Sequence, residues 1–288
     1  MRISKLLKEN DYSISFEVFP PKPGASFDSV MECTSSLAAL KPDFCSVTYG
    51  ASGNTAGNTV KVVKYVQDEL GMTPLAHLTC VQSSKEDIDK VLAELKDAGI
   101  VNIMALRGDL PKDIEDLKTD FKYASELIEY IKSKGDFCIG GACYPEGHPE
   151  SPDKQSDLEN LKRKAEAGAE FLTTQMFFDN SIFYNFMYRV RDIGIEVPIV
   201  PGIMPLTSSQ QISRIKELSG ANLPPTLLAM ADKFRNNPEA MKQAGIVFAS
   251  LQVLDLISNG IRAFHIYTMN KAEIYEGIYE NVRSAIGR

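Results

Sequence analysis

The sequence lacks an apolar run approaching the roughly 18 residues that a membrane-spanning helix needs. Residues 1–10 contain no apolar stretch and no small-residue cleavage site, so a secretory signal is not expected. The net charge is −7, and the 31 lysines and arginines are scattered, whereas a nucleic-acid surface needs clustered cations. We therefore expect a cytoplasmic protein that binds neither membrane nor nucleic acid.

Disulfide and metal patterns are also missing. The five cysteines are odd in number and form no CxxC pair, which favours reduced thiols packed as small apolar groups. His77 and Cys80 lie three residues apart, with Cys143 and His148 further along, but no HxH or CxxC accompanies them. This spacing is weak support for zinc, and we expect no metal site.

Short apolar runs alternate with longer amphipathic stretches along the whole chain. Predicted strands occupy residues 14–19, 44–48, 75–79, 101–106, 137–142, 170–176, 197–200 and 263–266. Predicted helices occupy residues 27–39, 57–69, 84–97, 120–134, 153–167, 180–193, 207–218 and 270–283, with two more within 225–258. Eight strand–helix units are typical of parallel βαβ structure, and no linker interrupts them, so one domain is expected over residues 1–288.

Eight such units form either an open doubly wound sheet or a closed barrel. An open dinucleotide-binding sheet needs a GxGxxG turn after its first strand, but residues 20–24 read Pro-Pro-Lys-Pro-Gly. The glycine-rich residues 50–53 lack the spacing of that motif. We therefore predict an α/β fold, a (β/α)8 TIM-type barrel with additional helices before the last strand.

Barrel enzymes carry their chemistry at the carboxyl ends of their strands. Nearly every predicted strand delivers a functional-type side chain there: Glu17, Thr48, His77, Arg107 with Asp109, Tyr144 with His148, Gln175, and His265 with Tyr267. Independent structural roles would not concentrate at one end, so the convergence predicts an active site. Each residue alone admits a structural role: Glu17 in a salt bridge is an equal alternative, and Arg107 could pair with Asp109.

A second feature is the charged face of the predicted helix 153–167. Asp157, Asn160 and Lys164 recur at i, i+3 and i+7 and share one face, beside Arg163. Such a face is usually only solvated, but it can also bind a diphosphate and ribose through charge-assisted hydrogen bonds. Composition does not decide between the two.

Seven segments together resemble the methylenetetrahydrofolate reductase family, in the order of that family, from about residue 12 to about residue 280. They are Phe16-Glu17-Val18-Phe19-Pro20-Pro21, His77-Leu78-Thr79-Cys80, Ala105-Leu106-Arg107-Gly108-Asp109-Leu110-Pro111, Tyr144-Pro145-Glu146-Gly147-His148-Pro149-Glu150, Thr174-Gln175-Met176-Phe177-Phe178-Asp179, Pro201-Gly202-Ile203-Met204-Pro205 and His265-Ile266-Tyr267-Thr268-Met269-Asn270. The resemblance implies a (β/α)8 barrel that holds FAD, which agrees with the fold predicted above.

The resemblance also implies the reaction. NADH or NADPH reduces FAD, and 5,10-methylenetetrahydrofolate then accepts the hydride in a ping-pong mechanism, giving 5-methyltetrahydrofolate for methionine synthesis and one-carbon metabolism. The folate ring must open first, which requires protonation of a departing nitrogen. A carboxylic acid in an apolar setting keeps its proton to higher pH, so Glu17, between Phe16 and Val18, is expected to be the catalytic acid.

Further roles follow from the resemblance alone. Asp109 would lie beside both the flavin and the folate pterin, as a catalytic and binding residue. FAD contacts are implied at Thr48, Ala51, His77, Arg107, Gly108, Asp109, Tyr123, Ala124, Tyr144, His148, Asp157, Asn160, Arg163 and Lys164. Folate contacts are implied at Glu17, Asp109, Gln175, Gln211 and Lys271. Lys271 stands where we expect arginine, and lysine lacks the fork that grips a carboxylate.

The chain ends soon after the last predicted helix, so the resemblance implies the short bacterial form and a homo-oligomer. Three alternatives stay open: another flavin barrel enzyme, similar to proline dehydrogenase, a folate- or flavin-binding module without catalysis, and a barrel enzyme without flavin. The first two do not require the acid at Glu17, and the third would leave the charged face from Asp157 to Lys164 unexplained. The sequence does not identify the electron donor, which could be NADH, NADPH or a partner protein.

Overall fold

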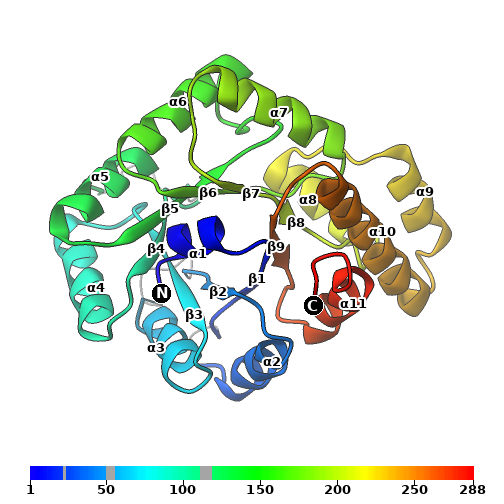
Figure 1. Ribbon diagram of the computed structural model, residues 1–288, viewed down its shortest axis with the longest axis horizontal. Helices are drawn as coiled ribbons and strands as arrows, with labels where there is room; N and C mark the ends of the chain where they lie inside the picture. The colour runs from blue at the N-terminus through cyan, green and yellow to red at the C-terminus, as the bar shows by residue number, and fades with distance from the viewer. Residues whose placement is uncertain (22–23, 50–55, 111–118) are drawn as a thin grey trace.

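In the computed structural model, which describes residues 1–21, 24–49, 56–110 and 119–288, nine parallel strands form a barrel inside a ring of helices (Figure 1). The strands are β1 Ser13–Val18, β2 Phe44–Val47, β3 Thr73–Thr79, β4 Asn102–Leu106, β5 Cys138–Cys143, β6 Phe171–Thr174, β7 Ile199–Val200, β8 Gly202–Ile203 and β9 Ala263–Tyr267. Their order in the sheet is β7-β6-β5-β4-β3-β2-β1-β9-β8. Every residue of β1 is buried, as expected for a strand covered on both faces.

The seventh predicted strand is split in two at Pro201. β7 pairs with β6, and β8 pairs with β9, so the two halves together close the barrel. Proline has no N–H to donate to a neighbouring strand, although the Pro201 carbonyl accepts a hydrogen bond from the backbone N–H of His265 at 2.9 Å. The (β/α)8 prediction is therefore confirmed, with the seventh strand built from two short pieces.

The helices of the ring follow the strands. They are α2 Asp28–Ala38, α3 Ala56–Asp68, α4 Lys85–Asp97, α5 Ala124–Lys134, α6 Lys154–Glu166, α7 Asn180–Asp192, α8 Gln211–Ser219, α9 Pro225–Lys233, α10 Pro238–Ser258 and α11 Ala272–Val282. The two helices predicted within residues 225–258 are α9 and α10. The helix predicted from residue 207 begins only at Gln211, because the Gln211 side-chain oxygen accepts hydrogen bonds from the N–H groups of Thr207 and Ser208 and holds them outside the helix.

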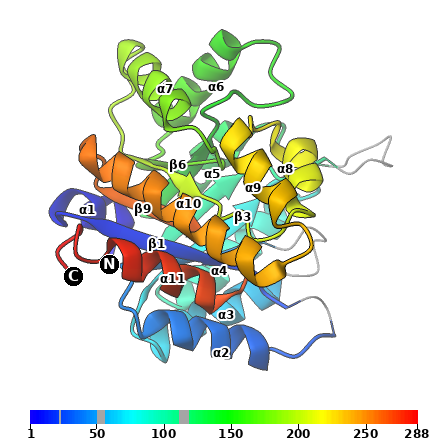
Figure 2. The same ribbon diagram turned by 90° about the vertical axis from the view of Figure 1, so that its right-hand side faces the viewer.

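One helix was not predicted at all. α1, Ile3–Glu9, lies across the end of the barrel at which the strands begin (Figures 1 and 2). Its Ile3 and Leu6 pack into a cluster with inward-facing strand residues, including Phe44 and Phe171. A seven-residue helix with so few apolar positions shows no helical period in a sequence. α1 closes this end of the barrel, so the opposite end is left for a site.

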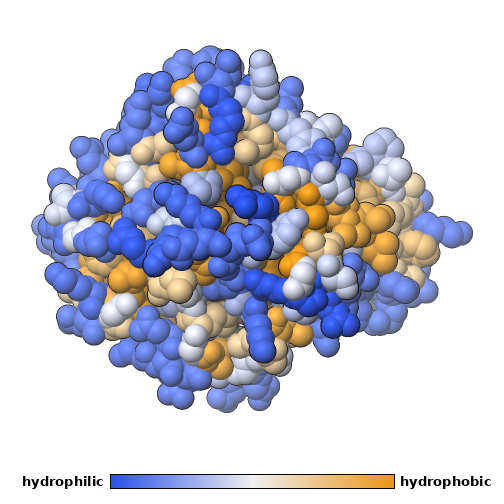
Figure 3. All heavy atoms as spheres, viewed as in Figure 1, coloured by the Kyte–Doolittle hydropathy of each residue, from blue (hydrophilic) through white to orange (hydrophobic). Residues whose placement is uncertain are grey.

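The expectation that no segment has the length and hydropathy of a membrane span is wrong for α10. This 21-residue helix contains a window of mean hydropathy 1.3. Its apolar composition has a local explanation, because α10 packs against α7, α9 and α11 and buries residues such as Met241, Val253 and Leu256. Leu251 remains 61% exposed, and Figure 3 shows apolar side chains at the surface over α9 and α10.

Candidate active site

Glu17 lies near the carboxyl end of β1, where it is only 8% exposed. Its Oε2 atom is 3.8 Å from Nε2 of His77, on β3. Burial raises the pKa of Glu17 to about 8, and burial lowers the pKa of His77 to about 4, because both charged forms lose hydration. At pH 7 the pair is therefore a protonated acid beside a neutral imidazole. Burial therefore disfavours the two charges that a salt bridge at Glu17 requires and favours a buried acid able to donate a proton.

Two serines that were not predicted as site residues hold the buried histidines. The Ser46 hydroxyl lies 2.5 Å from Nε2 of His77, and the Ser15 hydroxyl lies 2.9 Å from Nδ1 of His265. Ser15 also donates to the carbonyl of Phe264 at 3.1 Å. The alternation of side chains along a strand could have predicted that Ser46 faces the inside of the barrel, because it follows the inward-facing Phe44 by two residues in the same strand.

Arg107 does not pair with Asp109, the alternative that the sequence left open. Its guanidinium makes two hydrogen bonds to the Glu150 carboxylate, at 2.6 and 2.7 Å. This pairing raises the pKa of Arg107 and lowers that of Glu150. Between Arg107 and the exposed Asp109, Gly108 has φ +87, and an added Cβ would lie 2.6 Å from a Val81 methyl group. Only glycine allows the backbone this path at the end of β4.

The charged face of α6 divides into two pairs. The Lys164 amine donates to the Ala142 carbonyl at 2.8 Å, and Asp157 accepts from the Ser151 hydroxyl at 3.0 Å. Burial lowers the pKa of Lys164. In contrast, Arg163 and Asn160 are exposed and bond to each other at 3.0 Å. Lys164 and Asp157 therefore lie toward the end of β5, whereas the other two lie in solvent.

Aromatic and amide side chains complete the rim. The rings of Tyr144 and His148 meet edge to face at 4.6 Å, and burial lowers the pKa of His148. Tyr267 is half-buried, is paired with Glu17 in the strand register, and donates its hydroxyl to the Thr174 carbonyl at 2.7 Å. This contact joins β9 to β6 across the split seventh strand.

The remaining predicted residues are more dispersed. Thr48 follows β2, and its carbonyl accepts a hydrogen bond from the Thr59 hydroxyl at 3.0 Å. Tyr123, 50% exposed, and the buried Ala124 stand at the start of α5. Lys271 is exposed at the start of α11. Ala51 lies outside the described residues.

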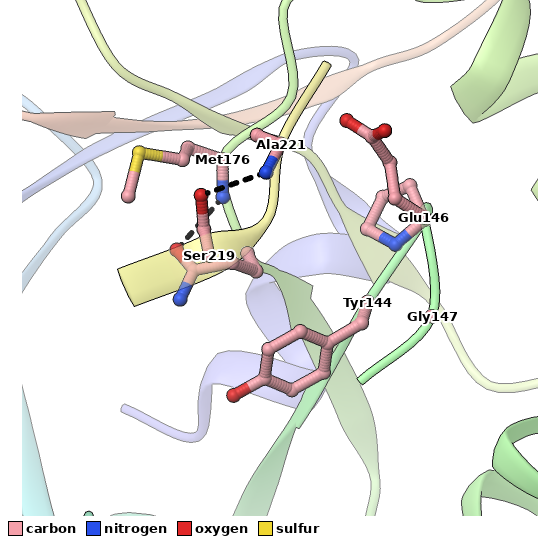
Figure 4. A pocket seen from close by; sticks show the side chains of 8 residues that line it. Tyr144, Glu146, Gly147, Met176, Ser219 and Ala221 are labelled. Atoms are coloured by element: carbon pink, nitrogen blue, oxygen red, sulfur yellow. Dashed lines mark hydrogen bonds between the residues drawn. The ribbon is translucent and has the colours of Figure 1, made fainter. Parts of the chain in front are cut away.

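A small cleft, with a volume of about 10 Å³, opens between Tyr144 and Ser219 (Figure 4). It is lined by Tyr144, Pro145, Glu146, Gly147, Gln175, Met176, Ser219 and Ala221. The Glu146 carboxylate accepts two hydrogen bonds from the Asn222 N–H, at 2.9 and 3.1 Å. This contact ties the loop after β5 to the segment after α8. Ser219 and Ala221 were not predicted, because their position beside Gln175 and Met176 cannot be inferred from the periodicity of the sequence.

The donor groups suit an anionic, ring-bearing ligand. The ammonium group of Lys164 carries three donors, and the Ala142 carbonyl accepts from one of them. Arg107 and the Tyr144–His148 pair lie at the same end of the barrel. Next to Arg107, the backbone at Gly108 runs so close to Val81 that a side chain would not fit. Cation, aromatic and backbone groups in this combination fit a dinucleotide cofactor.

Known proteins match both the sequence and this arrangement. The methylenetetrahydrofolate reductase family model matches residues 2–283. The chain belongs to this family. Two similar relatives are named 5,10-methylenetetrahydrofolate reductase: that of Pectobacterium carotovorum is 38% identical, covering 91% of this chain and 87% of its own, and that of Escherichia coli K12 is 36% identical, covering 92% and 89%.

Two further matches extend the comparison of this reductase family member. Methylenetetrahydrofolate reductase (NADH) 1 of Arabidopsis thaliana is 36% identical over 98% of this chain, which spans 50% of the plant protein. A solved structure from Clostridium thermocellum, of a protein described as binding two copies of 5-methyl-5,6,7,8-tetrahydrofolic acid, has TM-score 0.66 at 12% identity and covers 100% of this chain and 99% of its own. At that identity the likeness supports the barrel fold alone.

Proposed function

We propose that this oxidoreductase reduces 5,10-methylenetetrahydrofolate to 5-methyltetrahydrofolate, with bound FAD and a nicotinamide dinucleotide as electron donor. The observation that carries the proposal is the buried Glu17 at the carboxyl end of the barrel, whose pKa is raised by that burial, in a chain that belongs to the reductase family. A binding module without catalysis would not need an acid whose burial keeps it protonated at pH 7. A proline-dehydrogenase-like reaction would not need the acid either.

Glu17 is proposed to protonate the departing ring nitrogen of the folate. Its proton is available at neutral pH because the pKa is about 8, which is close to the value at which a general acid works best. Gln175, which lines the cleft with Tyr144, would bind the ring system of the folate and, in the other half-reaction, the nicotinamide. Asp109 would lie beside both the flavin and the folate pterin as a catalytic and binding residue, and Gln211 and Lys271 would hold other parts of the folate.

FAD, when bound, would supply the hydride carrier that connects the two substrates. Lys164, Arg107 and His148 would hold its charged and polar groups, with Asp157 on the ribose and the Tyr144 ring against an aromatic face. The remaining proposed contacts are Thr48, Ala51, His77, Gly108, Asp109, Tyr123, Ala124, Asn160 and Arg163. The homo-oligomer and the cytoplasmic location expected from the sequence belong to this proposal as well.

The proposed reaction is tested by following the visible absorbance of the purified protein without oxygen. We expect FAD to be released on denaturation, bleaching of the bound flavin by NADH or NADPH, and recovery of the colour on addition of methylenetetrahydrofolate. The two nicotinamides, each compared with buffer alone, identify the donor. A colourless protein, or a flavin that methylenetetrahydrofolate fails to reoxidise, would contradict the proposal.

The cofactor site is tested with Lys164→Met. Because the amine is half-buried and bonded to the end of β5, removing a charged hydrogen-bond donor there is expected to weaken FAD binding by about 2 kcal/mol, or roughly thirtyfold in Kd. Lys162→Met is the matched control, since Lys162 is exposed on the same helix. FAD titration of the apoprotein measures both. Equal FAD affinities in the two variants would show that Lys164 does not contribute to the cofactor site.

A further inference from the structure

The contact between Ser46 and His77 has no role in the proposed function so far. Ser46 is 1% exposed, and its hydroxyl lies 2.5 Å from Nε2 of His77. The same nitrogen is 3.8 Å from Oε2 of Glu17. Ser46 is paired with Glu17 in the register of β1 and β2. One nitrogen of the imidazole therefore faces both the serine hydroxyl and the proposed catalytic acid.

The direction of this hydrogen bond follows from what else the hydroxyl can reach. In the second pair, Ser15 donates to the Phe264 carbonyl, so Nδ1 of His265 must donate to Ser15. In the described part of the chain, the Ser46 hydroxyl has only the His77 ring as a partner. If Nε2 carried the hydrogen, the buried Ser46 hydroxyl would lack an acceptor, which costs about 1–3 kcal/mol. Ser46 is therefore the donor, and Nε2 is the acceptor.

We propose that Ser46 is a positioning residue that occupies the Nε2 lone pair of His77 and thereby keeps the acidic proton on Glu17. Burial already disfavours the charged forms of both groups, but a neutral imidazole with a free lone pair 3.8 Å from the carboxyl group would compete for that proton. With Nε2 already accepting from Ser46, the proton stays on the carboxyl group, where the folate can take it. This inference rests on the proposed role of Glu17.

The other titratable groups around this pair do not replace Ser46. Cys45 and Tyr267 lie close enough to Glu17 to interact with it electrostatically, and burial raises the pKa of both well above neutrality. His265 interacts with His77, and its pKa is lowered to about 3, chiefly by burial. All three are neutral at pH 7. No charge on these three groups therefore shifts the balance between Glu17 and His77, which burial and the hydrogen bond from Ser46 set together.

The experiment is 15N NMR of the histidine side chains in the flavin-loaded protein at pH 7. The chain has three histidines, so the signals can be resolved, and those of His265 are identified by their change in Ser15→Ala. In the wild type we expect a neutral His77 with a hydrogen-bonded, unprotonated Nε2. In Ser46→Ala we expect the Nε2 signal of His77 to lose its hydrogen-bond shift and a larger share of the ring to be protonated, with a roughly tenfold slower reoxidation of the flavin by methylenetetrahydrofolate. Reduction by the nicotinamide should change less than twofold.

Two variants separate this role from a structural one. Ser46→Thr keeps the hydroxyl and is expected to restore both the neutral signals and the rate, whereas Ser15→Ala removes the other serine–histidine bond and should leave His77 unchanged. If Ser46→Ala does not fold, Ser46→Cys gives the same comparison with a weak donor of similar size. A neutral His77 of unchanged tautomer in Ser46→Ala or Ser46→Cys would overturn the inference. The NMR signals of His77 can be measured without any catalytic turnover, so this test gives an answer even if the protein has no reductase activity.

Discussion

Glu17→Gln is expected to slow the reduction of methylenetetrahydrofolate by about 10²–10⁴-fold, the usual contribution of a general acid. Glutamine has nearly the same size and can still form hydrogen bonds, but it has no acidic proton to give to the departing nitrogen. Uptake of hydride from the nicotinamide needs no such proton and should stay near the wild-type rate. Rapid-mixing absorbance measurements without oxygen follow the two half-reactions separately.

Glu170→Gln is a suitable control for this variant. Glu170 is a partly buried carboxylate beside α1, at the opposite end of the barrel, where it bonds to Ser4 and Arg2. The Glu170→Gln variant shows the general effect of replacing a partly buried carboxylate. In this variant both half-reactions should keep near wild-type rates. A Glu17→Gln enzyme that reduces the folate at a near wild-type rate would show that the catalytic acid lies elsewhere.

Gly245→Ala is expected to lower the free energy of unfolding by about 3 kcal/mol or more, at the upper end of the range for overpacked sites. Gly245 lies in α10, and an added Cβ would stand 2.0 Å from the Leu206 carbonyl oxygen and 2.6 Å from its carbon. Backbone atoms cannot rotate away as a flexible side chain can. The segment after β8 must therefore shift, or α10 must move off the barrel. Denaturant unfolding measures the change.

Gly57→Ala provides the matched control, because Gly57 is also in a helix, α3, and an added Cβ meets nothing within 4 Å. Alanine is the better helix former by up to about 1 kcal/mol, so this variant should be slightly more stable than the wild type. The two substitutions are chemically the same, and only the surroundings differ. Equal effects at both positions would show that α10 does not pack as closely as described.

The barrel was predictable because its signal is repeated along the chain. Alternating strand and helix periods indicate βαβ units wherever an element is long enough to show its period, and the missing glycine fingerprint separated a barrel from an open sheet. α1 escaped prediction because seven residues with Ile3 and Leu6 as main core contacts carry no readable period. Pro201 indicated an interruption of the seventh strand. That β7 pairs with β6 and β8 pairs with β9 depends on the register of the strands in three dimensions, which the sequence does not show.

The candidate site was predictable as a set of positions but not as a set of contacts. Strand ends place Glu17, His77 and Arg107 at one rim, which follows from parallel topology alone. The partner of Arg107 is Glu150, from another loop, rather than Asp109 two residues away. The Ser46–His77 bond depends on strand register and side-chain rotamers, and neither is encoded in a local pattern.

The most direct test of the central claim is the pH dependence of flavin reoxidation by methylenetetrahydrofolate in the wild type and in Glu17→Gln. Because burial raises the pKa of Glu17 to about 8, the acid is protonated below that pH and loses its proton above it. The wild-type rate should be level near neutral pH and fall about tenfold per pH unit above about pH 8, while reduction by the nicotinamide shows no such decline. In Glu17→Gln the rate should be low and free of that limb. A limb that persists in Glu17→Gln, or a wild-type rate that stays level well above pH 8, would contradict the assignment of Glu17 as the acid.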